Sequence, residues 1–151
     1  MKINVIGIAL LCLSITACQS PTGIQTAFNI RAAHYLNPDI NGSAQPVMIS
    51  VYELKTPVEF NQASYQALTN NAAQALGSSL IDKQYVEIQP GIDQTLSQTV
   101  TVNTRYLGIV AAYRNIDQAT WRSVLTVPAG HRQIHINVNL ESQNLNAQLK
   151  G

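Results

Sequence analysis

The sequence predicts an all-β protein, a two-sheet antiparallel sandwich with a small helical insertion. About seven short runs of branched and aromatic residues recur at roughly ten-residue spacing, and most alternate between apolar and polar positions, as half-buried strands do. One stretch with helical spacing interrupts this series. The chain has 151 residues, of which 46% are apolar and 11% charged, and this suits a single domain with a packed core.

The N-terminus has the pattern of a secretory signal. Lys2 gives it a cationic start, residues 3–15 form an apolar run, and the small residues Thr16 and Ala17 follow. Because a membrane-spanning helix needs about 17 to 25 apolar residues, the run is too short for a permanent membrane anchor. Residues 1–17 are therefore predicted to be a lipoprotein signal peptide.

Cys18 directly follows this signal. The segment from Leu13 to Cys18 resembles a bacterial lipobox, in which a peptidase cuts before a Cys that becomes lipidated. It predicts covalent lipid on Cys18, the alternative being an ordinary secretory signal with an incidental Cys. Since two or more acyl chains anchor a protein stably, the motif implies a permanent tether. Gln19 is not the Asp that commonly retains lipoproteins in the inner membrane, so we expect the outer membrane.

Removal of the signal changes the composition of the protein. Lys2 and Cys12 leave with it, so that eight basic residues balance eight acidic ones and Cys18 is the remaining cysteine. This balanced charge, without a basic stripe in the sequence, gives no indication of a nucleic-acid partner. We predict a lipidated tether over residues 18–25, a sandwich domain over 26–141 and a loosely held polar tail over 142–151.

The first predicted strand covers residues 27–36, and the second covers 47–54. Turn-forming residues such as Pro38 and Gly42 separate them. Since about two residues suffice to join adjacent antiparallel strands, this connection is several times longer than a hairpin requires. Long loops on rigid sandwiches often bind partners, but a tolerated insertion or a crossover between sheets would also account for the length.

The helical insertion is predicted at about residues 58–77. Its apolar residues, from Phe60 to Leu76, have helical spacing, with a break near 69–71 and an end at Gly77. Strand patterns then resume. They cover residues 80–88, 96–102, 106–113, 121–127 and 134–140. The 106–113 stretch is almost continuously apolar, as expected of a central strand buried on both faces.

Residues that could support catalysis or bind a metal form no known motif. The sequence has no Gly-x-Ser-x-Gly elbow, phosphate-binding Gly loop or His-Glu-x-x-His helix. His131 and His135 would lie about 13 Å apart on one strand, too far to share an ion, and His34 could join either only through tertiary contact. The acidic residues are dispersed, mostly near turns, and we interpret them as solvated surface carboxylates. We therefore expect no enzyme, no metal and no cofactor beyond the lipid on Cys18.

Several segments, taken in order, resemble one family over about residues 28 to 140. They are Leu36-Asn37-Pro38-Asp39, Pro46 to Leu54, Phe60, Leu76-Gly77, Pro90-Gly91, Tyr106 to Arg114 and Trp121-Arg122. Together, and behind a lipobox, they are similar to the TssJ lipoprotein family of type VI secretion systems. Ser50 and Glu53 depart from the family pattern.

The resemblance implies a transthyretin-like two-sheet sandwich of about seven or eight strands. It also implies a lipoprotein on the outer membrane of a Gram-negative bacterium, facing the periplasm. Such a protein binds the periplasmic C-terminal part of TssM and so links the outer membrane to the TssL–TssM inner-membrane complex. The family's TssM-contacting loop corresponds here to Asn37, Pro38, Asp39, Ile40, Asn41, Gly42, Ser43, Ala44 and Gln45.

Four residues of the family pattern are interpreted as structural. We expect Tyr113 and Trp121 to pack in the sandwich, and Arg114 and Arg122 to bond nearby carbonyls or carboxylates. Two other classes of function stay open. One is a lipoprotein carrier that holds a small ligand at a sandwich end or in a groove beside the helical insertion, and the other is a periplasmic enzyme. Neither nucleic acid nor a small-molecule substrate is the expected partner.

Overall fold

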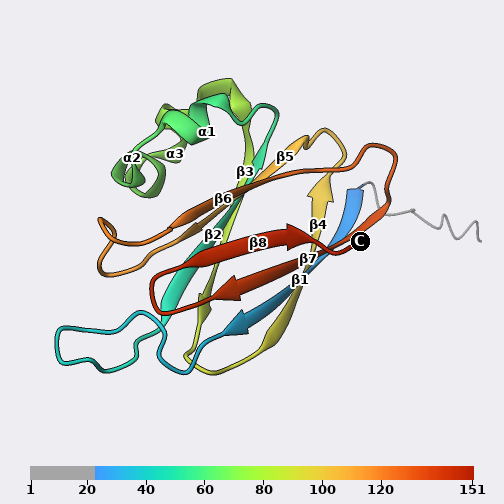
Figure 1. Cartoon of the computed structure of the whole chain (residues 1–151). Helices are drawn as coiled ribbons and strands as arrows, with labels where there is room; N and C mark the ends of the chain where they lie inside the picture. The colour runs from blue at the N-terminus through green and yellow to red at the C-terminus, as the bar shows by residue number, and fades with distance from the viewer. Residues whose placement is uncertain (1–22) are drawn as a thin grey trace, which may run out of the picture.

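Two four-stranded sheets pack face to face in the computed structural model, which describes residues 23–151 (Figure 1). The predicted signal peptide, Cys18 and most of the predicted tether lie outside the described residues. The strands are β1 (Gly23–Ala32), β2 (Val47–Leu54), β3 (Leu80–Ile88), β4 (Gln94–Thr101), β5 (Tyr106–Ala111), β6 (Arg122–Thr126), β7 (Gln133–Leu140) and β8 (Leu145–Leu149). The predicted all-β sandwich with short helices is confirmed.

The β1 sheet has the strand order β4-β1-β7-β8, and the β2 sheet has the order β3-β2-β5-β6. Within the β1 sheet, β1 and β7 are parallel, with Phe28 opposite Ile136. The prediction of a purely antiparallel sandwich is therefore wrong at this pair. Between β1 and β7 the chain passes through the other sheet, so no short hairpin has to join the two strands and they can run in the same direction.

Both ends of the predicted sandwich domain are corrected by the structure. β1 begins at Gly23, inside the predicted tether, and ends at Ala32 instead of residue 36. The predicted loose tail contains β8, in which Leu145 and Ala147 are buried and Val138 of β7 lies opposite Ala147. The remaining positions of β8 are polar or exposed. The segment does alternate between apolar and polar residues, but over only five positions within a polar stretch, and so short a pattern is a weak indication of a strand.

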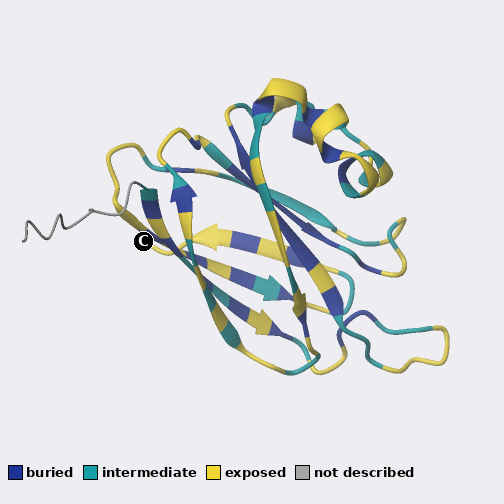
Figure 2. Cartoon of the chain, turned by 180° about the vertical axis from the view of Figure 1, so that it is seen from behind, coloured by how far each residue is buried: buried dark blue, intermediate teal, exposed yellow. Residues whose placement is uncertain are grey.

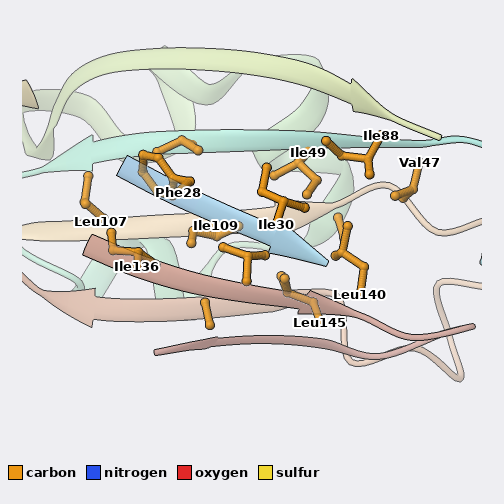
Figure 3. Packing of buried hydrophobic residues seen from close by; sticks show 14 of the residues in the cluster. Phe28, Ile30, Val47, Ile49, Ile88, Leu107, Ile109, Ile136, Leu140 and Leu145 are labelled. Atoms are coloured by element: carbon orange, nitrogen blue, oxygen red, sulfur yellow. The ribbon is translucent and has the colours of Figure 1, made fainter. Parts of the chain in front are cut away.

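The core lies between the two sheets and follows from the period-two alternation of their strands. Phe28 and Ile30 of β1 point toward Ile49 of β2 and Ile109 of β5, with Ile136 of β7 beside them (Figure 3). Figure 2 shows the resulting alternation of buried and exposed positions along the strands. Each such side chain contributes about 1.5 to 3 kcal/mol when it is fully buried, so the interface between the sheets dominates the stability of the domain.

A helical insertion covers the outer face of the β2 sheet at one end (Figure 1). It consists of α1 (Val58–Gln62), α2 (Tyr65–Asn70), α3 (Ala72–Leu76) and a 3-10 turn, η1 (Gly77–Ser79). Ser64 and Asn71 cap α2 and α3, each accepting a backbone N–H at 3.2 Å. Phe60 packs against Gly108 of β5 so closely that a Cβ there would lie 2.6 Å from the ring. Gly108 therefore allows the helices to lie on the sheet.

Glu53 is a buried carboxylate between the sheets, with 2% of its surface exposed. The interpretation of every acidic residue as solvated is wrong for Glu53, because alternation along β2 turns it inward with Val51. Its Oε2 accepts hydrogen bonds from the Thr101 N–H (2.9 Å) and the Thr104 hydroxyl (2.8 Å). Glu53 thus connects β2 to the end of β4 in the other sheet.

We predict that Glu53→Ala lowers the free energy of unfolding by about 2 to 4 kcal/mol, because the buried Thr104 hydroxyl and the partly buried Thr101 N–H lose their acceptor. Chemical denaturation measures the change. Glu87→Ala removes an exposed carboxylate from β3 and serves as the matched control, with an expected effect within about 0.5 kcal/mol. Equal effects of the two substitutions would contradict the role assigned to Glu53.

Candidate functional site

The connection between β1 and β2, residues 33–46, forms a projecting loop at one end of the sandwich (Figure 1). β1 and β2 belong to different sheets, so this connection is a crossover, one of the alternatives that its length left open. Crossing does not account for the whole loop, however. The Gln45 N–H donates to the Leu36 carbonyl at 2.9 Å, so the chain returns beside itself and the residues between these two add no reach.

Asn37 fixes the base of this loop. Its Nδ2 donates to the Pro46 carbonyl at 2.7 Å, and its Oδ1 accepts the Arg114 N–H at 2.8 Å. Its own backbone N–H donates to the Ser142 carbonyl at 2.9 Å. Asn37 is 4% exposed and has φ of 46°, a left-handed conformation that Asn tolerates better than most residues. The loop base is thereby joined to the β5–β6 and β7–β8 connections.

Asp39 organises the tip of the loop. Its Oδ1 accepts the N–H groups of Asn41 and Ser43, both at 2.9 Å, and its Oδ2 accepts Nε2 of Gln45 at 3.1 Å. The Ser43 N–H is the main cause that lowers the pKa of Asp39; burial opposes it, and the Asn41 N–H, the Arg114 charge and the Gln45 amide reinforce it. The ionised carboxylate therefore holds the tip in one conformation.

Ile40 lies at the tip and is 99% exposed, so it packs against nothing in its own chain. A hollow of about 570 Å³ lies beside it, between the loop and the start of the β5–β6 connection. Tyr35, which is 54% exposed, and Arg114 contribute to its wall. We call Ile40, Tyr35, Arg114 and this hollow the loop surface.

The structure brings together part of the predicted loop set and adds residues to it. Pro38, Asp39, Ile40 and Gly42 line the hollow, Asn37 lies in the base, and Asn41, Ser43 and Gln45 bond to Asp39. Ala44 is half-buried. Sequence reasoning missed Tyr35, Arg114, Asn115 and Gln143 as members of this surface. Arg114 stood in the family pattern, but its approach to the loop depends on the long-range bond to Asn37.

Two of the four family-pattern residues hold the helical insertion to the β2 sheet. Trp121 meets Tyr65 edge-on at 5.4 Å, and the Arg122 guanidinium lies 4.6 Å from the Trp121 ring centre. Nη1 of Arg122 donates to the carbonyls of Phe60 (3.1 Å) and Ala63 (2.9 Å). The predicted structural roles of Trp121 and Arg122 are confirmed.

Tyr113 has a structural role at the other end of β5. It is 3% exposed, and its hydroxyl donates to the Glu141 carbonyl at 3.3 Å. Burial raises the pKa of Tyr113, so the hydroxyl stays protonated and keeps this bond. Its predicted packing role is confirmed.

A second hollow, of about 590 Å³, lies between α2 and the β5–β6 connection, with Tyr65, Ile116 and Trp121 in its wall. This is where the carrier hypothesis would place a ligand. His34, His131 and His135 are all exposed. Over residues 23–151, no group of three or more His, Cys, Asp or Glu side chains is arranged to hold a metal ion. No helix in this same range is long and apolar enough to cross a membrane.

Comparison with known proteins identifies the family. A family model described as "Type VI secretion lipoprotein, VasD, EvfM, TssJ, VC_A0113" matches residues 24–143. The chain belongs to the TssJ family. TssJ proteins are structural lipoprotein components of the type VI secretion system and not a family of enzymes. A search of the curated proteins finds no match.

Solved structures support the same assignment. The chain is 38% identical to the T6SS lipoprotein TssJ1 from Pseudomonas aeruginosa, with a TM-score of 0.79 over 85% of this chain and 98% of that one. Serratia marcescens Lip, described as a membrane bound component of the Type VI Secretion System, is 24% identical with a TM-score of 0.76 over 82% and 96%, which supports the fold alone. A chain in a structure described as "T6SS protein TssM C-terminal domain (869-1107) from EAEC" is 25% identical, with a TM-score of 0.67 over 82% and 99%.

We predict that Asp39→Ala loosens the loop tip of this TssJ protein without unfolding the sandwich, because three donors lose one shared acceptor. Hydrogen exchange at the Asn41 and Ser43 amides should accelerate at least about tenfold, while the thermal midpoint stays unchanged. Asp117→Ala, an exposed change in the β5–β6 connection, is the control.

The ionisation of Asp39 gives a second measurement on the same network. The pKa of Asp39 is lowered, so the ionised carboxylate stabilises the loop tip fully above the ordinary aspartate pKa. This stabilisation is lost only as pH falls through the lower folded-state pKa. The amide shifts of Asn41 and Ser43 should therefore titrate with a midpoint below the ordinary aspartate range. A midpoint at or above that range would contradict the network.

Proposed function

We propose that this protein is a lipid-anchored outer-membrane component of a type VI secretion membrane complex, acylated at Cys18 and facing the periplasm. Its loop over residues 37–45 binds the periplasmic C-terminal part of TssM and so links the outer membrane to the TssL–TssM complex of the inner membrane. One observation carries the proposal. A loop held in a single conformation by Asn37 and Asp39 presents an unpacked Ile40 at its tip.

Such a loop has the physical properties of a binding element. Its backbone is ordered by hydrogen bonds within the chain, so little conformational entropy remains to be lost on binding. Ile40 is fully exposed to water, and its transfer into a partner's pocket contributes about 1.5 to 3 kcal/mol. Tyr35 and Arg114, beside the loop, are of the residue types that dominate protein interfaces.

The match to a structure named for TssM supports this partner. The TssM segment in that description, residues 869–1107, is longer than the present chain of 151 residues, so this chain could not cover 99% of it. The alignment nevertheless covers 99% of the matched chain. The matched chain is therefore shorter than that TssM segment. A TssJ-like chain within a structure named for the TssM C-terminal domain is what a complex of the two would contain.

The proposed role needs no chemical step by the protein. Acyl chains on Cys18 provide attachment, since two or more chains hold a protein stably on a bilayer. The sandwich provides a rigid body, with the Glu53 bridge and the Phe60–Gly108 contact fixing its parts. The loop surface provides recognition by shape, apolar contact and hydrogen bonding.

We predict that Ile40→Asp raises the Kd for the TssM periplasmic C-terminal domain by at least roughly tenfold, because an apolar contact is lost and a charge must be desolvated. Calorimetric titration measures binding, and the thermal midpoint should not change because the side chain is exposed. Val58→Asp, at a 52% exposed position on α1, is the matched control. Undiminished TssM binding by the Ile40→Asp protein would overturn the loop assignment.

We further predict that Cys18→Ser yields a folded protein that leaves the membrane fraction and abolishes type VI secretion, because the acylation site is lost. Membrane fractionation and a secretion assay test this, and Gln19→Ser is the neighbouring control. Mutant protein that stays in the outer-membrane fraction after a high-salt wash would contradict lipid anchoring.

A further inference from the structure

The eight basic and eight acidic residues that follow the predicted signal are distributed unevenly between the two ends of the sandwich. One end, which we call the anchor end, contains the start of β1, the end of β2, and the β4–β5 and β6–β7 connections. Backbone bonds hold these parts together: the Gln25 N–H donates to the Arg132 carbonyl (2.8 Å), and the Arg105 N–H to the Leu54 carbonyl (2.9 Å). The loop surface lies at the opposite end of β1 (Figure 1).

Three exposed cations belong to the anchor end, namely Lys55 after β2, Arg105 before β5 and Arg132 before β7. Val102, in the β4–β5 connection between them, is 54% exposed. Glu53, near the end of β2, is buried with its Oε2 bonded to Thr101 and Thr104, and the exposed carboxylate at this end is that of Asp82, opposite Glu53 on β3. Three exposed cations thus outnumber the one exposed strand carboxylate, and the anchor end presents an excess of positive charge near an exposed apolar side chain.

The opposite end carries most of the negative charge. Its acidic residues belong to the loop surface and to the neighbouring strand ends and turns: Asp39, Glu87, Asp93, Asp117 and Glu141. Arg31 and Arg114 are exposed cations at this end. In a negative surface potential, such a molecule is attracted by one end and repelled by the other.

The proposed acylation site lies next to the basic end. Gly23 starts β1 five residues after Cys18, and five residues reach at most about 18 Å even when fully extended. β1 itself spans ten residues, or about 30 Å, before the chain reaches the loop side. The acyl chains thus hold the anchor end, and not the loop surface, close to the lipid headgroups.

We propose that the anchor end is a membrane-contact surface for anionic phospholipids. Lys55, Arg105 and Arg132 face the headgroups, Val102 enters the interface, and the contact directs the loop surface toward the periplasm. The inference rests on the proposed acylation of Cys18 but not on the identity of the loop's partner. Exposed apolar residues flanked by cations are the side chains that bind such interfaces.

The test uses the lipidated protein reconstituted into phosphatidylcholine vesicles with or without phosphatidylglycerol. Mass spectrometry first establishes the acyl chains, so that a failure of the proposed lipidation is seen separately. Val102→Cys or Ile40→Cys then carries a fluorophore, because Cys12 is removed with the signal and acylation blocks Cys18. A quencher on the lipid headgroups reports how close each position lies to the membrane.

We expect the probe at residue 102 to be quenched several-fold more than the probe at residue 40 on phosphatidylglycerol vesicles, and high salt should reduce the difference. Loss of one anchor-end cation should lower the equilibrium constant for contact between the anchor end and the bilayer roughly fivefold. Loss of all three, by Lys55→Gln, Arg105→Gln and Arg132→Gln, should lower it roughly a hundredfold. Arg31→Gln, an exposed cation near the loop end of β1, is the matched control for Arg132→Gln and should have no effect.

Three outcomes would overturn the proposal. The first is equal quenching at positions 102 and 40 on phosphatidylglycerol vesicles that carry the acylated protein. The second is undiminished quenching in the triple variant, whose unchanged thermal midpoint confirms that it is folded. The third is loss of the contact in inorganic phosphate, but not in chloride of equal ionic strength, because that would indicate a site for a phosphate ion instead of a membrane surface.

Discussion

The buried amide of Asn37 is the interaction on which the functional end of this protein depends. One side chain donates to Pro46 across the base of the loop and accepts from Arg114 on another connection, while its backbone bonds to Ser142 on a third. An aspartate could not donate, and a leucine could do neither. Few residues other than Asn also accept its positive φ. The Asp39 network and the exposed Ile40 can be placed only because this base is fixed.

Much of the fold could be predicted from the sequence, because local signals bound its elements. β2 and β3 have the predicted limits. Pro46 marks the start of β2, and Gly77, where the helical pattern ends, comes shortly before β3. β8 was missed because its alternating pattern is only five residues long and lies in a polar stretch. The parallel pairing of β1 with β7 was missed because alternation does not specify the direction of a partner strand. Glu53 was misjudged because its two donors come from the end of β4 and the turn after it, which are distant in sequence.

The candidate site was predictable in part for the same reason. The loop over residues 37–45 could be found from its turn-forming composition and its excess length. The bond between Gln45 and Leu36 was needed to show that the residues between them are not required to cross from one sheet to the other. Tyr35 and Arg114 join the surface through tertiary contacts, which no local pattern encodes. The separation of charge between the two ends likewise depends on which turns the topology gathers at each end, and the net charge of the chain conceals it.

The central position of β1 in its sheet has a mechanical consequence. β1 lies between β4 and β7, begins five residues after the proposed anchor at Cys18 and leads directly into the proposed partner-binding loop. Tension between two membranes would therefore act along β1. The ladder bonds to β4 and β7 run across the strand, so they would be loaded together in shear instead of being broken one by one as at a peeled edge. The strand that joins anchor to loop is thus the one whose rupture requires the most bonds to fail at once.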